Sequence, residues 1–186
     1  MKKITVIALT ILFSSCNAQK IRTMGKFDIA AFNKNKNHLN RYIDTLDNGT
    51  IIEQRESANF YEEIVKLKDS YFEKYRRYYK NGNLQLEGEY LNNDFQKGIW
   101  KEYNKKGELL EETDYDKGFE YTWEDLLEYL QKRKVDIKDT DNTTIRNENG
   151  NWRFSYIEGI YIYDIIIDGK TGKIIQDAKN EFEEGS

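Results

Sequence analysis

A repeat of 25 residues in the middle of the chain is the feature that most limits what this sequence can fold into. When the sequence is compared with itself at that offset, aromatic, glycine and leucine residues coincide. The matched pairs are Tyr75/Trp100, Tyr78/Tyr103, Gly82/Gly107, Leu84/Leu109, Glu87/Glu112 and Tyr90/Tyr115. Each unit is typical of a strand, a turn that requires glycine, and a returning strand, and the aromatic residues at fixed places are expected to pack against one another from unit to unit. Because two units are too few for a solenoid, the flanking segments are expected to complete the sheet.

The dipeptide Asn-Gly, which is favoured in tight hairpin turns, occurs three times. Turns at Asn48, Asn81 and Asn149 are expected to join strands within residues 42–54, 75–90 and 144–156. The segment 58–71 fits both a helical stripe and a strand, and we favour a strand. Residues 160–167 are rich in Ile and Tyr, and with residues 173–175 they predict two further strands around a glycine-containing connection.

Helix-forming patterns are limited to two segments. Thr122 and Asp125 have the spacing of a capping box, and the apolar residues that follow at helical intervals are Trp123, Leu126, Leu127 and Leu130. This pattern predicts the main helix over residues 122–133. Residues 27–32 predict one or two helical turns, and residues 177–186 an acidic tail that frays.

The N-terminus has the pattern of an export signal. Lys2 and Lys3 precede an apolar run of ten residues, which is too short to span a bilayer, and two serines lead to Cys16. Residues 1–15 therefore resemble a bacterial lipoprotein signal that is cleaved before a lipidated Cys16. Phe13 stands where leucine is commonest in such signals. The alternative is a general secretory signal with an incidental cysteine, but a lone free cysteine in an exported protein favours lipidation.

Charge limits the choice of partner. Removal of residues 1–15 leaves 27 basic against 33 acidic residues and no basic tract, which argues against nucleic acid as a partner. Residues 111–128 concentrate negative charge, with eight carboxylates and one lysine. Such a region attracts basic partners, although a solvated acidic face is the plainer interpretation. The candidate partner-binding residues are Glu112, Asp114, Asp116 and Glu120.

Residues for catalysis are scarce. His38 is the only histidine and Cys16 the only cysteine, so the sequence lacks the usual ligands of a zinc site and the usual pairs for nucleophilic catalysis. The aspartates of residues 136–143 have some likeness to a calcium loop, but the glycine and the closing glutamate of that motif are absent. We therefore predict a protein without enzymatic activity, cofactor or bound metal.

The segments Tyr78–Leu84 and Gly98–Leu109 resemble the MORN-repeat variant family, whose members are often labelled YwqK-type antitoxins. The resemblance covers about residues 72–118. It implies β-hairpin repeats and, for function, the neutralisation of a toxin. The leader resembles those of lipoproteins from the Bacteroidetes group, and the segment from Trp152 to Ile175 is similar to the strand pair of PepSY-like domains.

These features together predict an α+β fold that is mainly antiparallel β, with MORN-like hairpin repeats extended by flanking strands and one main helix near residues 122–133. The expected parts are a signal peptide over 1–15, a lipid-anchored tether with a short helical turn over 16–40, the repeat region over 41–118, a helix with C-terminal hairpins over 119–176, and the acidic tail over 177–186.

The expected function is protein–protein binding by an immunity or antitoxin-type protein. Its partner is a protein, by hypothesis a basic toxin, and its only contact with a membrane is the N-terminal lipid, which places it in the bacterial cell envelope on a periplasmic or outer-membrane face. The alternative is a structural or accessory envelope lipoprotein with no toxin partner.

Overall fold

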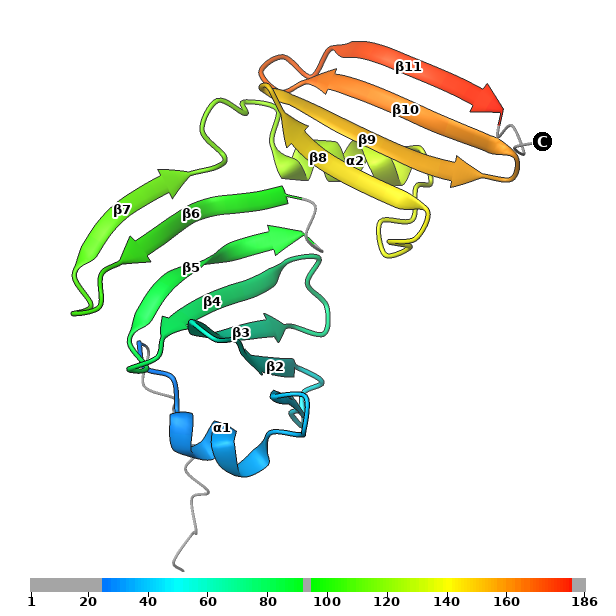
Figure 1. Cartoon of the computed structure of the whole chain (residues 1–186). Helices are drawn as coiled ribbons and strands as arrows, with labels where there is room; N and C mark the ends of the chain where they lie inside the picture. The colour runs from blue at the N-terminus through cyan, green and yellow to red at the C-terminus, as the bar shows by residue number, and fades with distance from the viewer. Residues whose placement is uncertain (1–24, 92–94, 182–186) are drawn as a thin grey trace, which may run out of the picture.

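The computed structural model describes residues 25–91 and 95–181, and it shows a mainly antiparallel β fold with two sheets and two helices (Figure 1). In the first sheet seven strands follow one another in chain order: β1 (Arg41–Thr45), β2 (Ile51–Glu56), β3 (Phe60–Lys66), β4 (Glu73–Tyr79), β5 (Leu84–Leu91), β6 (Phe95–Tyr103) and β7 (Leu109–Asp114). The second sheet has the order β11-β10-β9-β8, formed by β8 (Thr143–Glu148), β9 (Asn151–Glu158), β10 (Tyr161–Asp168) and β11 (Ile174–Glu181). The helices are α1 (Ile29–Asn35) and α2 (Trp123–Lys132). None of the helices in these residues has the length and apolar character needed to cross a membrane.

The three Asn-Gly turns lie where the sequence predicts them. They connect β1 to β2, β4 to β5 and β8 to β9, and each pair of strands is antiparallel. Gly82, with a φ of +83°, adopts the left-handed backbone conformation that favours glycine. The ambiguous segment 58–71 contains the strand β3, which confirms the preference for a strand, because pairing with both β2 and β4 decides between two patterns that the residues alone allow.

The 25-residue repeat corresponds to two stacked hairpins, β4–β5 and β6–β7. The Trp100 ring is buried, stacks on Tyr75 at a centroid distance of 6.0 Å, and lies directly over Gly88. The two hairpins are also joined near their turns, since the hydroxyl of Tyr79 at the end of β4 donates to the carbonyl of Tyr103 at the end of β6 at 2.9 Å. The predicted aromatic packing between units is confirmed for this pair of rings.

A small core attaches the N-terminal segment to the first sheet. Phe27 stacks on Tyr61 at 4.6 Å and also contacts Tyr78, while Phe32 of α1 is fully buried beside them. The short helix expected here is present, but the residues from Phe27 onward are packed on the sheet and do not form a free tether. The rest of the predicted tether, residues 16–24, lies outside the described residues.

The larger core lies between α2 and both sheets. The predicted capping box of Thr122 and Asp125 begins α2, and Leu126 and Leu130 on its inner face are fully buried. The Trp123 ring packs against Phe95 of the first sheet, at a centroid distance of 5.7 Å, and against Trp152 of the second, at a centroid distance of 6.3 Å. The helix thus lies on the face of the second sheet that is turned toward the first, and one hydrophobic core joins the two sheets (Figure 1).

The expectation that the chain frays from residue 177 is wrong for its first part. β11 continues to Glu181 and pairs with β10 along its whole length. Asp177 accepts two hydrogen bonds from the Arg133 guanidinium, at 2.6 and 2.7 Å, and this long-range ion pair adds to the strand pairing. The sequence suggested a solvated acidic tail because the partner of Asp177 is 44 residues away. Residues 182–186 lie outside the described residues.

Candidate functional site

Cys16, the predicted lipidation site, lies outside the described residues, so its modification stays a prediction. His38 is exposed in the loop after α1. Within residues 25–91 and 95–181, no cluster of three or more histidine, cysteine, aspartate or glutamate side chains has the arrangement of a metal site.

The structure places the four predicted partner-binding residues along β7 and the loop that follows it, where each of them already has a partner in the same chain. The Glu112 carboxylate lies 3.2 Å from the Lys101 ammonium group. Asp114 accepts a hydrogen bond from the backbone of Asp116, and Asp116 accepts one from the backbone of Gly98, both at 3.0 Å. These two aspartates therefore stabilise the end of the β6–β7 hairpin. Glu120 is separate and highly exposed, 3.8 Å from Lys170.

Lysines from outside the acidic segment 111–128 neutralise much of its charge. Four of its eight carboxylates lie within 4 Å of such a lysine, in the pairs Glu112–Lys101, Glu120–Lys170, Glu124–Lys97 and Glu128–Lys132. The hydrogen bond from Lys97 also lowers the pKa of Glu124 below its ordinary value. The surface is consequently less acidic than the sequence count indicates.

The structure places Glu111, the first residue of the acidic segment, opposite Glu102 of β6, a residue that sequence analysis did not single out. Like charges in this cross-strand position repel. Neither carboxylate has a cationic partner within the described part of the chain. Counting outward from the turn before Gly107 would pair Glu102 with Leu110, but the register shifts by one residue between Glu102 and Tyr103, so the sequence alone does not predict this pairing.

β7 is a free edge of the first sheet, and all six of its residues are exposed. Two of them are large apolar residues, Leu109 at 51% and Leu110 at 60% exposure. An unpaired strand edge presents backbone hydrogen-bonding groups on which another chain can pair. The edge of β7 is therefore a candidate docking strand.

On the face of the first sheet opposite Trp100, charged side chains of alternating sign lie side by side across five neighbouring strands. They are Glu63, Arg76, Glu87, Lys101 and Glu112, one from each strand between β3 and β7. Arg76 lies 3.4 Å from Glu63 and 3.6 Å from Glu87. Burial by itself lowers the pKa of Arg76, but the neighbouring Tyr78, Glu63 and Glu87 outweigh it and hold that pKa above its ordinary value. We call this set the charge row.

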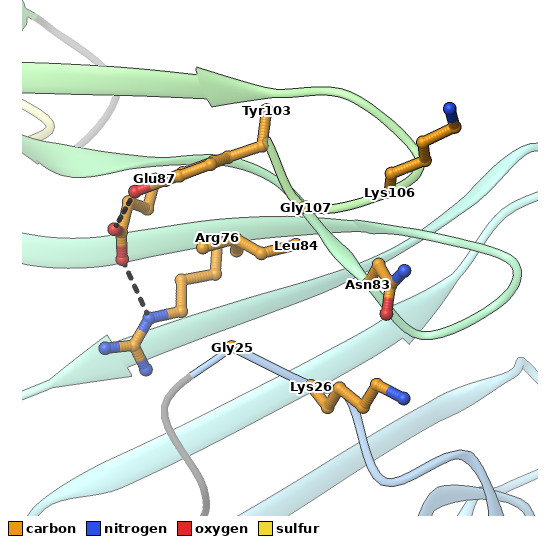
Figure 2. Close-up of a pocket in the computed structure, with 9 residues that line it drawn as sticks. All are labelled: Gly25, Lys26, Arg76, Asn83, Leu84, Glu87, Tyr103, Lys106 and Gly107. Carbon is orange, nitrogen blue, oxygen red and sulfur yellow. Dashed lines mark hydrogen bonds and ion pairs between the residues drawn. The ribbon is translucent and has the colours of Figure 1, made fainter. Parts of the chain in front are cut away.

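A pocket of about 420 Å³ opens beside the charge row (Figure 2). It is lined by Gly25, Lys26, Arg76, Asn83, Leu84, Glu87, Tyr103, Lys106 and Gly107. Glu87 is held on one side of it by Arg76 and by the Tyr103 hydroxyl, which donates to the carboxylate at 3.0 Å. Burial, and then this hydrogen bond, raise the pKa of Tyr103.

Two lysines that line this pocket have no ionic partner in the described part of the chain. The ammonium groups of Lys26 and Lys106 have no ion pair or hydrogen bond with any other residue in the described ranges. Figure 2 shows both side chains on the side of the pocket away from Glu87, with Asn83 between their two segments. The pocket thus has a neutralised half at Arg76 and Glu87 and a positively charged half at the two lysines.

Comparisons of this chain with protein-family models, with curated proteins and with solved structures found no match. The function proposed below therefore rests on features of this chain itself, chiefly the exposed edge of β7.

Proposed function

We propose that this chain is a lipid-anchored protein of the bacterial cell envelope that binds another protein through the free edge of β7, as an immunity or antitoxin-type protein. It acts by binding and not as an enzyme. The leader ending at Cys16 supports the anchoring, and the resemblance of residues 72–118 to the MORN-repeat variant family supports the antitoxin role. The observation that carries the proposal is the open, fully exposed edge strand.

The backbone of β7 is suited to pairing with an added strand. The Tyr115 N–H donates to the Gly98 carbonyl at 3.0 Å, which makes this a hydrogen-bonded pair. In an antiparallel ladder, hydrogen-bonded pairs alternate with pairs that do not bond to each other. Glu112 and Asp114 belong to the second kind, so their backbone N–H and C=O groups point away from β6. A strand of the partner would pair with these groups and cover the exposed Leu110.

The charges on this edge favour a basic partner over a second copy of the same chain. Glu111 already faces Glu102 across the hairpin. A second β7 paired on the same edge would bring further carboxylates beside them, and opposed like charges destabilise a strand pair. Lysine or arginine in the added strand would instead neutralise the Glu102–Glu111 pair.

One observation favours the alternative, a structural or accessory envelope lipoprotein without a toxin partner. Half of the carboxylates in the acidic segment are neutralised by lysines of the same chain, which reduces the attraction for a basic toxin. Charged residues on an edge strand also protect a sheet against aggregation.

The two functions are separated by deleting the gene in its own host and exposing the mutant to competing sibling strains. For the immunity role, deletion sensitises the cells, and the wild-type gene restores protection. A variant with Glu111→Lys and Glu120→Lys fails to restore it. The control variant Asp141→Lys and Glu158→Lys has the same change of charge at two exposed positions, one in the turn before β8 and one at the end of β9, and restores it fully. Normal growth of the deletion mutant against every strain contradicts the immunity role and favours the accessory one.

A further inference from the structure

The second sheet also has an open edge, the strand β11, which has no part in the binding proposed for β7. Figure 1 shows β11 as the outermost strand of this sheet, on the side away from the first sheet. Its pairing with β10 is regular over residues 176–181, because the one irregularity of the pair lies at Ile175, near the start of the strand. β11 is therefore an extended strand with one side of its backbone available to a further strand.

The open edge carries a negative and a positive side chain two residues apart on one face. Asp177 and Lys179 both lie on the face that carries α2: Asp177 bonds to Arg133 just after that helix, and the Lys179 ammonium group lies 3.6 Å from the centroid of the Tyr161 ring. Asp177 is still 39% exposed, and Lys179 has no ion pair with a carboxylate in the ranges that the structure describes. Ala178 lies between them and on the opposite face.

We propose that a second copy of this chain binds here, by antiparallel pairing of β11 with its own β11 about a two-fold axis at Ala178. In this register Asp177 of each copy lies opposite Lys179 of the other, which gives two equivalent ion pairs on one face. On the other face, Gln176 of each copy lies opposite Asn180 of the other, and the two small Ala178 side chains meet at the axis. The second sheets of the two copies then form one continuous sheet.

Charge selects this register over its neighbours. Two-fold antiparallel pairing always sets one residue opposite itself, so each register is defined by that residue. Placing Asp177 or Lys179 there opposes two like charges, and placing Gln176 there opposes Lys173 to Lys179. Registers centred nearer either end leave most of the strand unpaired. The register at Ala178 is the one that combines a long overlap with opposite charges.

The dimer is expected to be weak and reversible. Stable protein interfaces bury about 1,200–2,000 Å², which is more than a single pair of strands supplies. Backbone hydrogen bonds provide the affinity of such an added strand, and the charges mainly decide its register. The association should therefore depend on protein concentration. It is independent of the partner proposed for β7, because the two edges belong to different sheets.

The first test is sedimentation equilibrium of the purified chain carrying Cys16→Ser, which removes the only cysteine and the lipid site. We expect a monomer–dimer equilibrium. Lys179→Glu is expected to weaken dimerisation by about tenfold or more, because two attractive cross-strand pairs become repulsive. The control Lys34→Glu makes the same change of charge at an exposed residue of α1 and should dimerise like its parent.

The second test examines the register in the same background. Opposed residues of antiparallel strands have Cα atoms about 4.5–5.5 Å apart, a distance that a disulfide spans, so Ala178→Cys should form a covalent dimer on mild oxidation. Asn180→Cys lies on the same face of β11, but in this register its counterpart is roughly 14 Å away along the strand, and it should remain monomeric.

Three results would each overturn the proposal. The first is a monomer at every concentration up to about 1 mM, where even a weak dimer is populated. The second is a dimer that Lys179→Glu and Lys34→Glu leave equally strong, because the contact would then lie elsewhere. The third is a disulfide that forms as readily at Asn180→Cys as at Ala178→Cys, because the strands would then not be held in this register.

Discussion

The contact between Trp100 and Gly88 makes a quantitative prediction about how the two repeat units hold together. A methyl group added at Gly88 would lie 2.2 Å from Cδ2 of Trp100. Carbon atoms in ordinary contact are about 3.5–4.0 Å apart, so in a Gly88→Ala variant the indole ring must move by more than about 1 Å. The ring is not free to do so, because it stacks on Tyr75, contacts the edge of Tyr115, and donates its N–H to the Glu89 carbonyl at 3.0 Å.

The expected cost of Gly88→Ala follows from these contacts. Overpacking of a filled site costs about 1–3 kcal/mol, and loss of the indole hydrogen bond adds about 1 kcal/mol. Gly88→Ala is therefore expected to lower the free energy of unfolding by about 2–4 kcal/mol. Trp100→Ala, which removes a buried aromatic side chain, is expected to cost about 3–5 kcal/mol.

A double-mutant cycle separates the steric contact from other effects of the alanine. Once Trp100 is alanine, the methyl group at residue 88 has space, and the change from glycine to alanine in a strand gains about 0.5–1 kcal/mol. Urea unfolding followed by circular dichroism measures all four proteins. The reasoning is refuted if Gly88→Ala costs the same in both backgrounds, or if it leaves the wild-type stability unchanged.

Two further predictions concern the N-terminal region. Cys16→Ser is expected to abolish labelling with radioactive fatty acid and to move the protein from the detergent phase to the aqueous phase; continued labelling and unchanged partitioning would refute lipidation at this residue. Hydrogen bonds from Lys36 and then from Lys80 lower the pKa of Glu56 to about 2, compared with about 4.5 when unperturbed. Because the folded-state pKa is the lower one, the stabilisation by Glu56 is present above about pH 4.5 and is lost as the pH falls toward 2. In thermal unfolding between these pH values, Glu56→Gln is expected to lose less stability than the wild type, and equal losses would show that this ion pair does not connect α1 to the sheet.

Local signals in the sequence were sufficient for much of the fold. Asn-Gly at Asn81 predicts its hairpin because Gly82 takes the left-handed backbone conformation that the turn requires, and the capping box at Thr122 predicts where α2 begins. The repeat predicts the packing of Tyr75 against Trp100, because equivalent residues of neighbouring hairpins lie on the same face of the sheet. Each of these predictions depends on residues that are close in sequence or related by the repeat.

The predictions that failed or were incomplete depend on long-range pairing. Nothing near Phe27 in the sequence indicates that its ring stacks on Tyr61, and nothing near Asp177 indicates Arg133. Long-range pairing also explains why the charge of the candidate site was only partly predicted. The sequence shows where carboxylates are concentrated, but the register of the strands decides that Glu112 meets Lys101 while Glu111 meets Glu102. Charge on a sheet surface cannot be summed along the chain, because each residue's neighbours belong to other strands.

The most direct test of the proposed function is site-specific photo-cross-linking in the living host, with a photoreactive amino acid in place of Leu110 on β7. The matched control carries the same amino acid at Ile157 of β9, which is also exposed. We expect residue 110, but not residue 157, to cross-link to one basic protein, and we expect Glu111→Lys with Glu120→Lys and raised salt each to reduce that product. Equal products from both positions, or a product at residue 110 that neither charge reversal nor salt reduces, would contradict binding of a basic partner at the edge of β7.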